Sequence, residues 1–575
     1  MNRLSFKMKI ICVVGAIVLV VVCLLTVNFF SSSCYYRNPL NITIEPAANF
    51  GEPRIDHFHM GADLRTKGRV GLPVYAVADG YVSEVLLEEK GYGKCLIITH
   101  NNGTSSLYAH LSLYYDTLEN LVSAKQYASK SWEQHAFFKP SMFRVRKGDL
   151  VGYSGNTGTS EGPHLHFELR DTKSGDALNP LLNGYVIKDK LSPFVKGLYW
   201  YNRNKSFYAS PGKIIELEKQ GDAYHAKNIM YIGTSEFSLG IEANDKMNET
   251  KFNMGVYSIR MYLDDTPVFA FAMRRIPIHD TRYVNACIDY ATRLNMHKDI
   301  QLLTILPGNK LKIFNDSLGD GIIRLKDTEM HTIQIELKDE AGNTTNVVVQ
   351  VQRSPIKRTA ENLTKEPAFL NFNKAQSGTS KNAAFYFPAG AFYDDVPFAL
   401  QETKSLHAQA ASVEVEPVYP QIPVHTGYYV TLKILDRIPK ALRKNIVMRL
   451  TNQNGETCVK GNSDGNYIKG RFNELGNVKL LIDTVAPTIA TLGWKNGDVF
   501  NNKTGSLQLL CNDNLGTVES LSGFLDGQWL LFYRKGNVFT YTFDNHLQRG
   551  SHILHVAVKD IAGNEKKQTF SFSNP

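Results

Sequence analysis

The segment from Pro163 to Arg170 alternates strictly between polar and apolar side chains, which is the period of a β-strand. One face carries two histidines and a glutamate, and the other carries three apolar side chains: His164, His166 and Glu168 against Leu165, Phe167 and Leu169. Side chains two residues apart on a strand lie only about 6–7 Å from each other. One histidine can therefore bind a metal while the other reaches a substrate or a metal-bound water.

A second stretch adds a histidine and a carboxylate: His57-Phe-His-Met-Gly-Ala-Asp63. His59 and Asp63 are separated by three residues, among them Gly61, where the backbone can bend or approach another group closely. Imidazole and carboxylate ligands together suit zinc. Two histidines and one carboxylate leave the fourth position of a tetrahedral zinc site open for water, as a catalytic zinc requires.

Neither motif is diagnostic alone, because a His-x-His pair on a strand is more often an ordinary surface or core pair than a pair of ligands. What favours a metal site is the order of four motifs along the chain: His59…Asp63, Leu107-Tyr-Ala-His110-Leu, Gly155-Asn-Thr-Gly158, and Gly162-Pro-His164-Leu-His166.

With these motifs in this order, the sequence resembles the lysostaphin-like or LytM-type zinc metallo-endopeptidases, which cut cell-wall peptidoglycan and have the duplicated hybrid motif fold. The resemblance covers about residues 50–185. It implies one zinc ion (Zn²⁺) per chain, held by His59, Asp63 and His166. It also implies that His110 and His164 flank the reacting water and the developing oxyanion, and it leaves open which of them does which.

None of the five positions is substituted. This bears on function, because some relatives lose ligands and act as non-hydrolytic activators of other wall enzymes. The resemblance therefore implies a zinc-dependent endopeptidase that cleaves the peptide cross-links of peptidoglycan. The alternative is an envelope scaffold that binds peptidoglycan or a partner amidase without hydrolysis. A third hypothesis keeps the hydrolase but makes its substrate a secreted protein.

Three features near these motifs have weaker interpretations. His57 has the wrong spacing to Asp63 for the first ligand, so we expect it to be only a neighbour of the site. Glu168 shares the histidine face, and we expect a carboxylate that is solvated or contacts a ligand. The loop from Gly152 to Gly162 lacks the Gly-Lys-Ser/Thr ending of a phosphate-binding loop, so it is predicted to be a tight turn that shapes the substrate groove.

The first 35 residues predict an export signal or a membrane anchor. Arg3, Lys7 and Lys9 precede an apolar run from Ile10 to Phe30. Its length is nearer the ~20 residues of a membrane-spanning helix than the ~7–15 residues of a cleavable signal core. Positive charge before such a run predicts that everything after it lies outside the cytoplasm.

Three fates of this segment stay open. It is a permanent anchor, a peptide cleaved after Ser31–Ser33, or a lipoprotein signal with Cys34 as the attachment site, although Ser31 stands where such a signal usually has Leu. We expect an exported protein of the cell envelope, periplasmic and attached to the inner membrane.

Composition and cysteine usage narrow the function classes. The 43% hydrophobic and 11% aromatic content is that of a folded protein. The net charge of +9 is spread over 575 residues with no Lys/Arg run interleaved with aromatics, so no nucleic-acid surface is predicted. No Cys-x-x-Cys zinc knuckle is present, and Cys95, in an apolar strand-like run, is predicted to be a buried free thiol.

We predict a mainly β protein with several domains. After the N-terminal segment 1–35, an antiparallel β-barrel or β-sheet metallopeptidase domain covers 36–190. Within it, Gly71–Val82 and Val145–Gly152 read as strand, turn and strand. The insertion between His110 and Val145 is predicted to hold a helix at 118–130 and an aromatic segment at 132–143, which form either one wall of the groove or a packing insert.

From about Leu191 the pattern changes to short alternating strands with turn residues, which is typical of β-sandwiches. Two segments resemble each other: in each, an alternating strand enters an Asp-x-Ala-Gly-Asn turn, at Asp339–Asn343 and at Asp560–Asn564. We predict immunoglobulin-like domains at 191–358 and 483–575, with another β-sandwich at 359–482. We expect them to be spacers or binding modules that reach through the envelope and contact other envelope proteins.

Overall fold

The computed structural model describes residues 35–574, except residues 186, 249, 355–367, 501–504 and 517. The chain is mainly β, as predicted, with several β-domains after the N-terminal one. Residues 1–34, which hold nearly all of the predicted signal or anchor, lie outside the described residues. Among the residues that are described, no helix combines the length and the apolar character needed to cross a membrane.

The N-terminal domain, residues 35–185, contains two antiparallel sheets and one long helix. The larger sheet has the strand order β1-β2-β11-β6-β5-β4-β8, and the smaller has the order β3-β10-β7. The bounds are β1 Pro46–Ala48, β2 Ala62–Arg65, β3 Pro73–Tyr75, β4 Gly80–Leu87, β5 Lys94–His100, β6 Thr104–Leu111, β7 Leu113–Tyr114, α2 Asp116–Ser129, β8 Gln134–Phe137, β9 Arg144–Val145, β10 Leu150–Tyr153, β11 His164–Asp171 and β12 Ala177–Leu178.

Strand β11 has the two faces that its sequence predicts. Leu165, Phe167 and Leu169 are fully buried in the core of the N-terminal domain. The strand lies between β2 and β6, and in that register His166 is opposite Asp63 on one side and Ala109 on the other. The sheet therefore brings the polar face of β11 beside the end of β2 and beside His110 of β6.

Helix α2 occupies the insertion where a helix was predicted. Its first turn carries Asp116 and Glu119, which favour a helix N-terminus electrostatically, and Lys130 ends it in the left-handed conformation with φ 50°. Leu118 and Val122 are buried against the domain core, while Tyr127 faces the far end of the chain.

The first β-domain, residues 194–353, places two sheets around one core. In the larger sheet β16 and β17 pair with β26 in parallel, and the other strands are antiparallel. The bounds are β13 Phe194–Asn202, β14 Lys213–Ile215, β15 Leu217–Gln220, β16 Ala223–Ala226, β17 Met230–Ile232, β18 Glu236–Lys246, β19 Asn253–Met254, β20 Ser258–Leu263, β21 Thr266–Ala272, β22 Arg275–Ile276, α3 Tyr290–Met296, β23 Gln301–Leu302, β24 Ile323–Arg324, β25 Met330–Lys338 and β26 Thr344–Arg353.

The N-terminal domain and the first β-domain share part of their structure. Strand β12 pairs with β22, so the large N-terminal sheet continues into the next domain. Phe50, Phe58 and Met60, which flank the predicted ligand His59, belong to the hydrophobic core of the first β-domain. The segment that carries the first metal-binding motif is therefore held from two sides.

The second β-domain, residues 369–482, again contains two main sheets around one core. Its strands are β27 Phe369–Leu370, β28 Gln376–Thr379, β29 Ala383–Phe387, β30 Val396–Pro397, β31 Leu400–Thr403, β32 Glu414–Pro417, β33 Tyr428–Lys433, β34 Ile446–Asn452, β35 Gly455–Val459, β36 Asn462–Asp464, β37 Tyr467–Phe472 and β38 Asn477–Ile482.

The third β-domain, residues 488–574, has two four-stranded antiparallel sheets. Its strands are β39 Thr488–Leu492, β40 Ser506–Asn512, β41 Val518–Leu525, β42 Gln528–Leu530, β43 Tyr533–Lys535, β44 Val538–Thr542, β45 Gly550–Asp560 and β46 Glu565–Asn574. The two similar sequence segments form two similar hairpins, β25–β26 and β45–β46, each with the Asp-x-Ala-Gly-Asn turn at its tip. The domain boundaries predicted from the sequence stay predictions.

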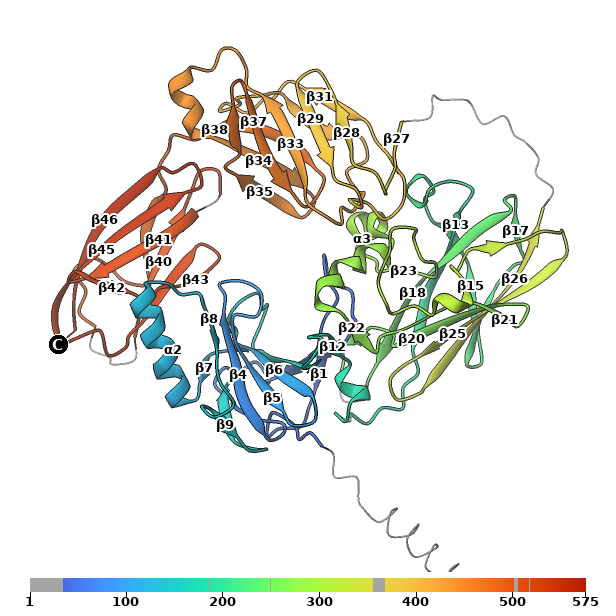
Figure 1. The fold of residues 1–575 in the computed structure, drawn as a ribbon, viewed down its shortest axis with the longest axis horizontal. Helices are drawn as coiled ribbons and strands as arrows, with labels where there is room; N and C mark the ends of the chain where they lie inside the picture. Colours follow the sequence, from blue (N-terminus) through green and yellow to red (C-terminus); the bar gives the residue numbers. More distant parts are fainter. Residues whose placement is uncertain are drawn as a thin grey trace, which may run out of the picture.

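The four domains follow one another around a ring, and the third β-domain returns to the N-terminal domain (Figure 1). Tyr127 of α2 donates a hydrogen bond to Asp544 over 2.7 Å, and its ring stacks on His546. Trp132 packs against Tyr533 with their ring centroids 4.8 Å apart. The aromatic insertion therefore contacts the other end of the chain, a placement that the sequence did not indicate.

Candidate metal centre

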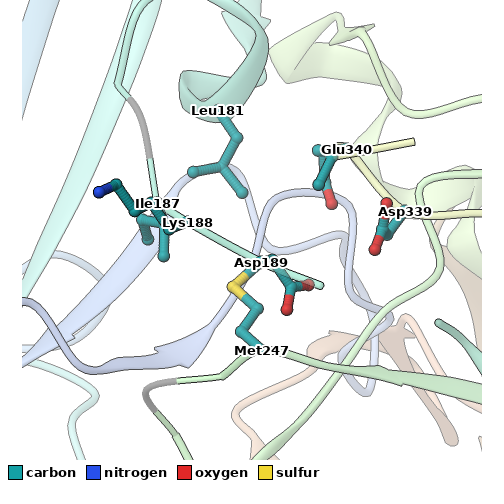
Figure 2. A pocket seen from close by; sticks show the side chains of 8 residues that line it. Leu181, Ile187, Lys188, Asp189, Met247, Asp339 and Glu340 are labelled. Carbon is teal, nitrogen blue, oxygen red and sulfur yellow. The ribbon is translucent and has the colours of Figure 1, made fainter. Parts of the chain in front are cut away.

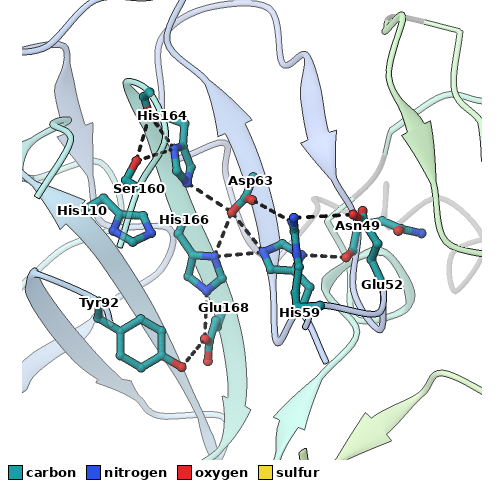
Figure 3. A network of polar contacts seen from close by, with 12 residues as sticks. Asn49, Glu52, His59, Asp63, Tyr92, His110, Ser160, His164, His166 and Glu168 are labelled. Carbon is teal, nitrogen blue, oxygen red and sulfur yellow. Dashed lines mark hydrogen bonds and ion pairs between the residues drawn. The ribbon is translucent and has the colours of Figure 1, made fainter. Parts of the chain in front are cut away.

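Three side chains of the N-terminal domain direct one atom each to a common point (Figure 3). Nε2 of His59 lies 3.0 Å from Asp63 Oδ1 and 3.0 Å from Nδ1 of His166, and the same Oδ1 lies 2.8 Å from Nδ1 of His166. His59 and His166 are buried. Two imidazoles and one carboxylate form the donor set that a zinc ion prefers.

Hydrogen bonds on the outer side of each imidazole fix which nitrogen faces this point. Nδ1 of His59 lies 2.7 Å from the carbonyl oxygen of Asn49, and Nε2 of His166 lies 2.9 Å from the Glu168 carboxylate. Both partners can only accept, so these nitrogens carry the protons. The inner nitrogens, Nε2 of His59 and Nδ1 of His166, then present lone pairs to each other and to Asp63. Acceptors this close need a cation between them, so the residues present fit a bound metal ion.

A proton can take the place of that cation. Burial opposes a charge on His166, but the hydrogen bonds with Asp63 and Glu168 outweigh it and raise the pKa of the imidazole to about 9. Burial likewise opposes the charge of Asp63, and the histidines around it overcome this and hold its pKa well below the ordinary value. Asp63 is therefore a carboxylate, and binding of a metal here would release a proton from His166.

Glu168 holds His166 in place through a buried network. The carboxylate is fully buried, and it accepts hydrogen bonds from Nε of Arg170 over 2.7 Å and from the Tyr92 hydroxyl over 2.7 Å. Burial would raise its pKa, but the positive charges of Arg170 and His166 lower it to about 2. Of the two expectations for Glu168, contact with a ligand is the one that the structure shows.

His110 and His164 lie beside the three converging atoms. Nδ1 of His110 donates to the carbonyl of Thr157 over 2.8 Å, and Nδ1 of His164 donates to the carbonyl of Gly162 over 2.8 Å, so both rings present Nε2 to the site. The two ring centroids are 4.7 Å apart, and Nε2 of His164 lies 3.4 Å from Asp63 Oδ1.

The surroundings of His110 lower its affinity for a proton. Burial, reinforced by the positive charge of His166 and His164, lowers the pKa of His110 to about 3. His110 is therefore a neutral imidazole at any ordinary pH. The predicted neighbour His57 is half exposed and pairs with Asp56 over 2.7 Å, outside the group.

The glycine-rich loop closes against the site as a tight turn. Gly158 has φ 69°, and a Cβ there would lie 2.4 Å from the backbone nitrogen of Gly93. Ser160 lies 3.2 Å from Nδ1 of His164. From outside, the third β-domain reaches the same loop: Nζ of Lys535 donates to the carbonyls of Asn156 and Ser160 over 3.2 and 3.3 Å.

All five histidine and aspartate positions singled out in the sequence are thus brought together, from β2, β6, β11 and the segment before β2. The sequence did not single out Tyr92, Arg170 or the carbonyl of Asn49, which orient the ligands from behind. Arg170 continues the polar face of the alternating strand, so its side of the strand was readable from the sequence and its partner was not.

Comparison with known proteins identifies the region around this centre. The family described as Peptidase family M23 matches residues 57–180, which contain all five positions. These residues form a peptidase family M23 domain. A second family, described as Zu5-like domain, matches residues 367–483, which covers the second β-domain.

Three curated relatives align with the M23 domain. An "Uncharacterized metalloprotease" of Haemophilus influenzae is 35% identical over 123 residues, which are 21% of this chain and 20% of the relative. "DD-carboxypeptidase/endopeptidase Mpg" of Neisseria meningitidis serogroup B is 35% identical over 123 residues, 21% of this chain and 22% of the relative. "Peptidoglycan DD-endopeptidase ShyA" of Vibrio cholerae is 30% identical over 142 residues, 24% of this chain and 27% of the relative. The chain therefore spans 20–27% of the length of these relatives.

Proposed function

We propose that this chain is a zinc-dependent endopeptidase that cleaves the peptide cross-links of peptidoglycan. The observation that carries the proposal is the convergence of two imidazole lone pairs and a carboxylate oxygen within 3.0 Å of one another, with His110 and His164 facing the same space. Two of the aligned relatives, from Neisseria and Vibrio, are named as endopeptidases, and one of these names specifies peptidoglycan.

His59, Asp63 and His166 would hold one zinc ion. When bound, it would supply a Lewis acid that polarises the scissile carbonyl and lowers the pKa of water. Zinc rather than magnesium or calcium is favoured by two nitrogen ligands among three. With the metal bound, Glu168 and the Asn49 carbonyl would hold the remaining proton of each ring on the nitrogen that faces away from the metal, because each accepts a hydrogen bond from that nitrogen.

The two remaining histidines would act on the attacking water and on the developing oxyanion. His110 is neutral and presents its Nε2 lone pair to the site, so we assign to it a hydrogen bond from the attacking water and the acceptance of the proton of that water as the peptide bond is attacked. Nε2 of His164 lies 3.4 Å from Oδ1 of Asp63, on the same side of the site. We assign to His164 the hydrogen bond to the developing oxyanion, a role that requires a proton on its Nε2.

The decisive experiment is digestion of purified peptidoglycan by the zinc-loaded protein, with products separated by mass. We expect cross-linked dimers to become monomers with the wild type and not with His166→Ala. Unchanged dimers in the presence of stoichiometric zinc would contradict the proposal and favour the envelope scaffold that binds without hydrolysis.

Substitution of ligand and non-ligand histidines separates metal binding from chemistry. His166→Ala should lose both zinc and hydrolysis. His110→Ala should keep stoichiometric zinc, measured by elemental analysis, and lose about 10²–10³-fold in rate. Full activity in either variant would refute the assignment of these residues.

An exported, membrane-attached location belongs to the same proposal. Its support is the positively charged and apolar N-terminal sequence, with Cys34 as an alternative attachment point. The first and third β-domains are proposed to be immunoglobulin-like modules, on the basis of their equivalent final hairpins. They would contact envelope polymers or proteins, and fractionation of cells with detection of the chain in membrane and periplasm tests the location.

A further inference from the structure

Three aspartates converge where the M23 domain meets the first β-domain. Asp189 lies in the connecting segment, Asp245 lies in β18, and Asp339 begins the turn after β25. One carboxylate oxygen from each lies within 4.8 Å of the others. Asp189 and Asp339 border a pocket of about 290 Å³, and Figure 2 shows their carboxylates directed into the same space.

Asp245 is a buried carboxyl group without a polar partner. Its side chain is fully buried, and neither carboxylate oxygen has a hydrogen-bond partner of normal geometry. Within the described part of the chain, none of the three aspartates forms an ion pair with a basic side chain. Burial and the neighbouring Asp339 carboxylate raise the pKa of Asp245 to about 8. An unpaired carboxylate in such a place is costly unless a cation accompanies it.

A second group of the same composition lies where the second and third β-domains meet. Asp483, Asp513 and Asp560 again bring one carboxylate oxygen each within 4.8 Å of one another. Asp483 is fully buried, and its Oδ2 has no hydrogen-bond partner. Oδ1 of Asp513 is also a buried atom without a hydrogen-bond partner.

The two groups occupy equivalent places in the first and third β-domains. The first aspartate of each stands four residues before a proline at the entry to the domain, at Asp189…Pro193 and Asp483…Pro487. Its Oδ1 accepts from the backbone nitrogen two residues on, over 3.1 Å in both cases. The second aspartate follows an asparagine at the end of a strand, at Asn244-Asp245 and Asn512-Asp513.

The third aspartate of each group opens the Asp-x-Ala-Gly-Asn turn. Asp339 accepts from the backbone and side-chain nitrogens of Asn343 over 2.8 and 2.6 Å. Asp560 accepts from the same two groups of Asn564 over 2.8 and 2.9 Å. The same three-carboxylate arrangement therefore occurs twice, built on sequence elements that the two domains share.

We propose that each of these two junctions binds one calcium ion. The ligands are all oxygens, which excludes the nitrogen-rich preference of zinc and suits a hard cation. Calcium accepts a flexible geometry of several protein oxygens, whereas magnesium demands a near-ideal octahedron and usually keeps several waters, so three carboxylates from separate segments favour calcium. A Ca²⁺ ion among the three carboxylates of each group would also supply the positive counter-charge that Asp245 and Asp483 lack.

Calcium at these places would fix the angle between neighbouring domains. Glu340, next to Asp339, accepts from Asn179 of the M23 domain over 3.0 Å. In the second group, Asn564 donates to the carbonyl of Asp483 over 3.0 Å, and Lys460 of the second β-domain donates to the carbonyl of Ala562 over 3.0 Å. Each group of three aspartates thus joins the linker before a β-domain to the Asp-x-Ala-Gly-Asn turn of that β-domain. The same turn contacts the domain that precedes the linker.

Calorimetric titration of the full chain tests the stoichiometry. The protein is freed of metal by a chelator, reloaded with one equivalent of zinc and titrated with Ca²⁺ alone. We expect two calcium ions per chain in the wild type and one in each of Asp245→Asn and Asp483→Asn. Asp436→Asn, an exposed aspartate outside both groups, should keep two. No binding, or two ions in every variant, would overturn the proposal.

Thermal unfolding separates a calcium site from a merely structural aspartate. Calcium should raise the unfolding temperature of the wild type, and this gain should be reduced in Asp245→Asn. Without calcium at pH 7, the same variant should unfold at nearly the same temperature as the wild type, because the raised pKa leaves Asp245 mostly uncharged and the amide is nearly isosteric with the protonated carboxyl group. A variant that is less stable than the wild type with and without calcium would show that Asp245 is only structural.

Discussion

Glu168 determines which nitrogen of His166 faces the metal centre, because its carboxylate can only accept the proton of Nε2. The isosteric change Glu168→Gln offers an amide that can donate instead, which leaves the proton on Nδ1, where the metal must bind. We expect zinc affinity to fall about 10–100-fold, as measured by competition with a chelator of known affinity.

An exposed glutamate of the same domain provides the matched control. Glu133→Gln removes a carboxylate that contacts neither His166 nor Arg170 and should bind zinc as the wild type does. Equal affinity of Glu168→Gln and Glu133→Gln would show that the orientation of His166 does not depend on Glu168.

His110 should make the N-terminal domain less stable in acid. Its pKa is lowered to about 3 in the folded protein, from about 6.5 in the unfolded chain. Between these values the unfolded chain binds the proton and the folded chain does not, so stability is lost as the pH falls below about 6.5. From pH 7 to pH 5 the loss is about 2 kcal/mol.

The comparison that isolates this effect is wild type against His110→Gln, followed by denaturant unfolding of the same metal-loaded form at each pH. The difference in unfolding free energy between the two proteins should shrink by about 2 kcal/mol from pH 7 to pH 5. A constant difference would mean that His110 is protonated as readily in the folded protein as in the unfolded chain.

The convergence of His59, Asp63, His110, His164 and His166 was predictable because their residue types and order are a strong pattern, and a strand period shows which side chains share a face. Their supports were not. Tyr92 reaches Glu168 from 76 residues away, and Asn49 holds His59 through a backbone carbonyl, which leaves no trace in the choice of side chain.

At the scale of elements, the glycine-rich loop positions His110 and His164 through backbone carbonyls. Gly158→Ala places a Cβ 2.4 Å from the backbone of Gly93 at a φ of 69°, so the loop must move. We expect kcat/KM to fall about 10–100-fold with zinc content unchanged, in an assay on a soluble cross-linked peptide.

The same loop contains its own control. A Cβ at Gly162 meets nothing within 4 Å, and that residue does not have a positive φ, so Gly162→Ala should retain nearly full activity. Similar activity of the two variants would show that the path of the loop does not determine the position of the histidines.

The strands and helix of the N-terminal domain were accessible from sequence periodicity, and helix α2 begins and ends within two residues of the predicted bounds. The pairing of β12 with β22 was not, because two-residue strands carry no periodic signal. The parallel pairing of β16 and β17 with β26 could not be predicted either, since alternation of polar and apolar residues does not distinguish parallel from antiparallel neighbours.

At the scale of the whole molecule, the sequence predicts β-domains that reach through the envelope, and it gives no sign that the third of them contacts the M23 domain. These contacts join residues that are 375 and 417 positions apart in the sequence. No local sequence pattern predicts such a contact, because it depends on how all the domains between the two residues pack against each other. Tyr533 accepts a hydrogen bond from the backbone of Gly158, and Lys535 binds two carbonyls of the same loop.

Lys535→Met should loosen that loop. We expect kcat/KM to fall about threefold, the effect of losing a solvent-exposed charged hydrogen bond. Lys566→Met, at an exposed position of the same domain, is the control and should leave kcat/KM unchanged. Higher activity of Lys535→Met would indicate that the third β-domain restricts the substrate rather than supporting the loop.

The ring arrangement makes the position of Lys535 the sum of three domain junctions (Figure 1). In a series of linked rigid domains, a small rotation at one junction displaces every domain beyond it. The displacement of the last domain is the sum of the displacements from all the junctions. A substitution of the buried Asp483, which lies far from the metal centre, would then displace Lys535 and with it the glycine-rich loop beside His164. The rigidity of the distant domain junctions, and not only the residues of the metal centre, would then determine how precisely the loop is positioned beside His164.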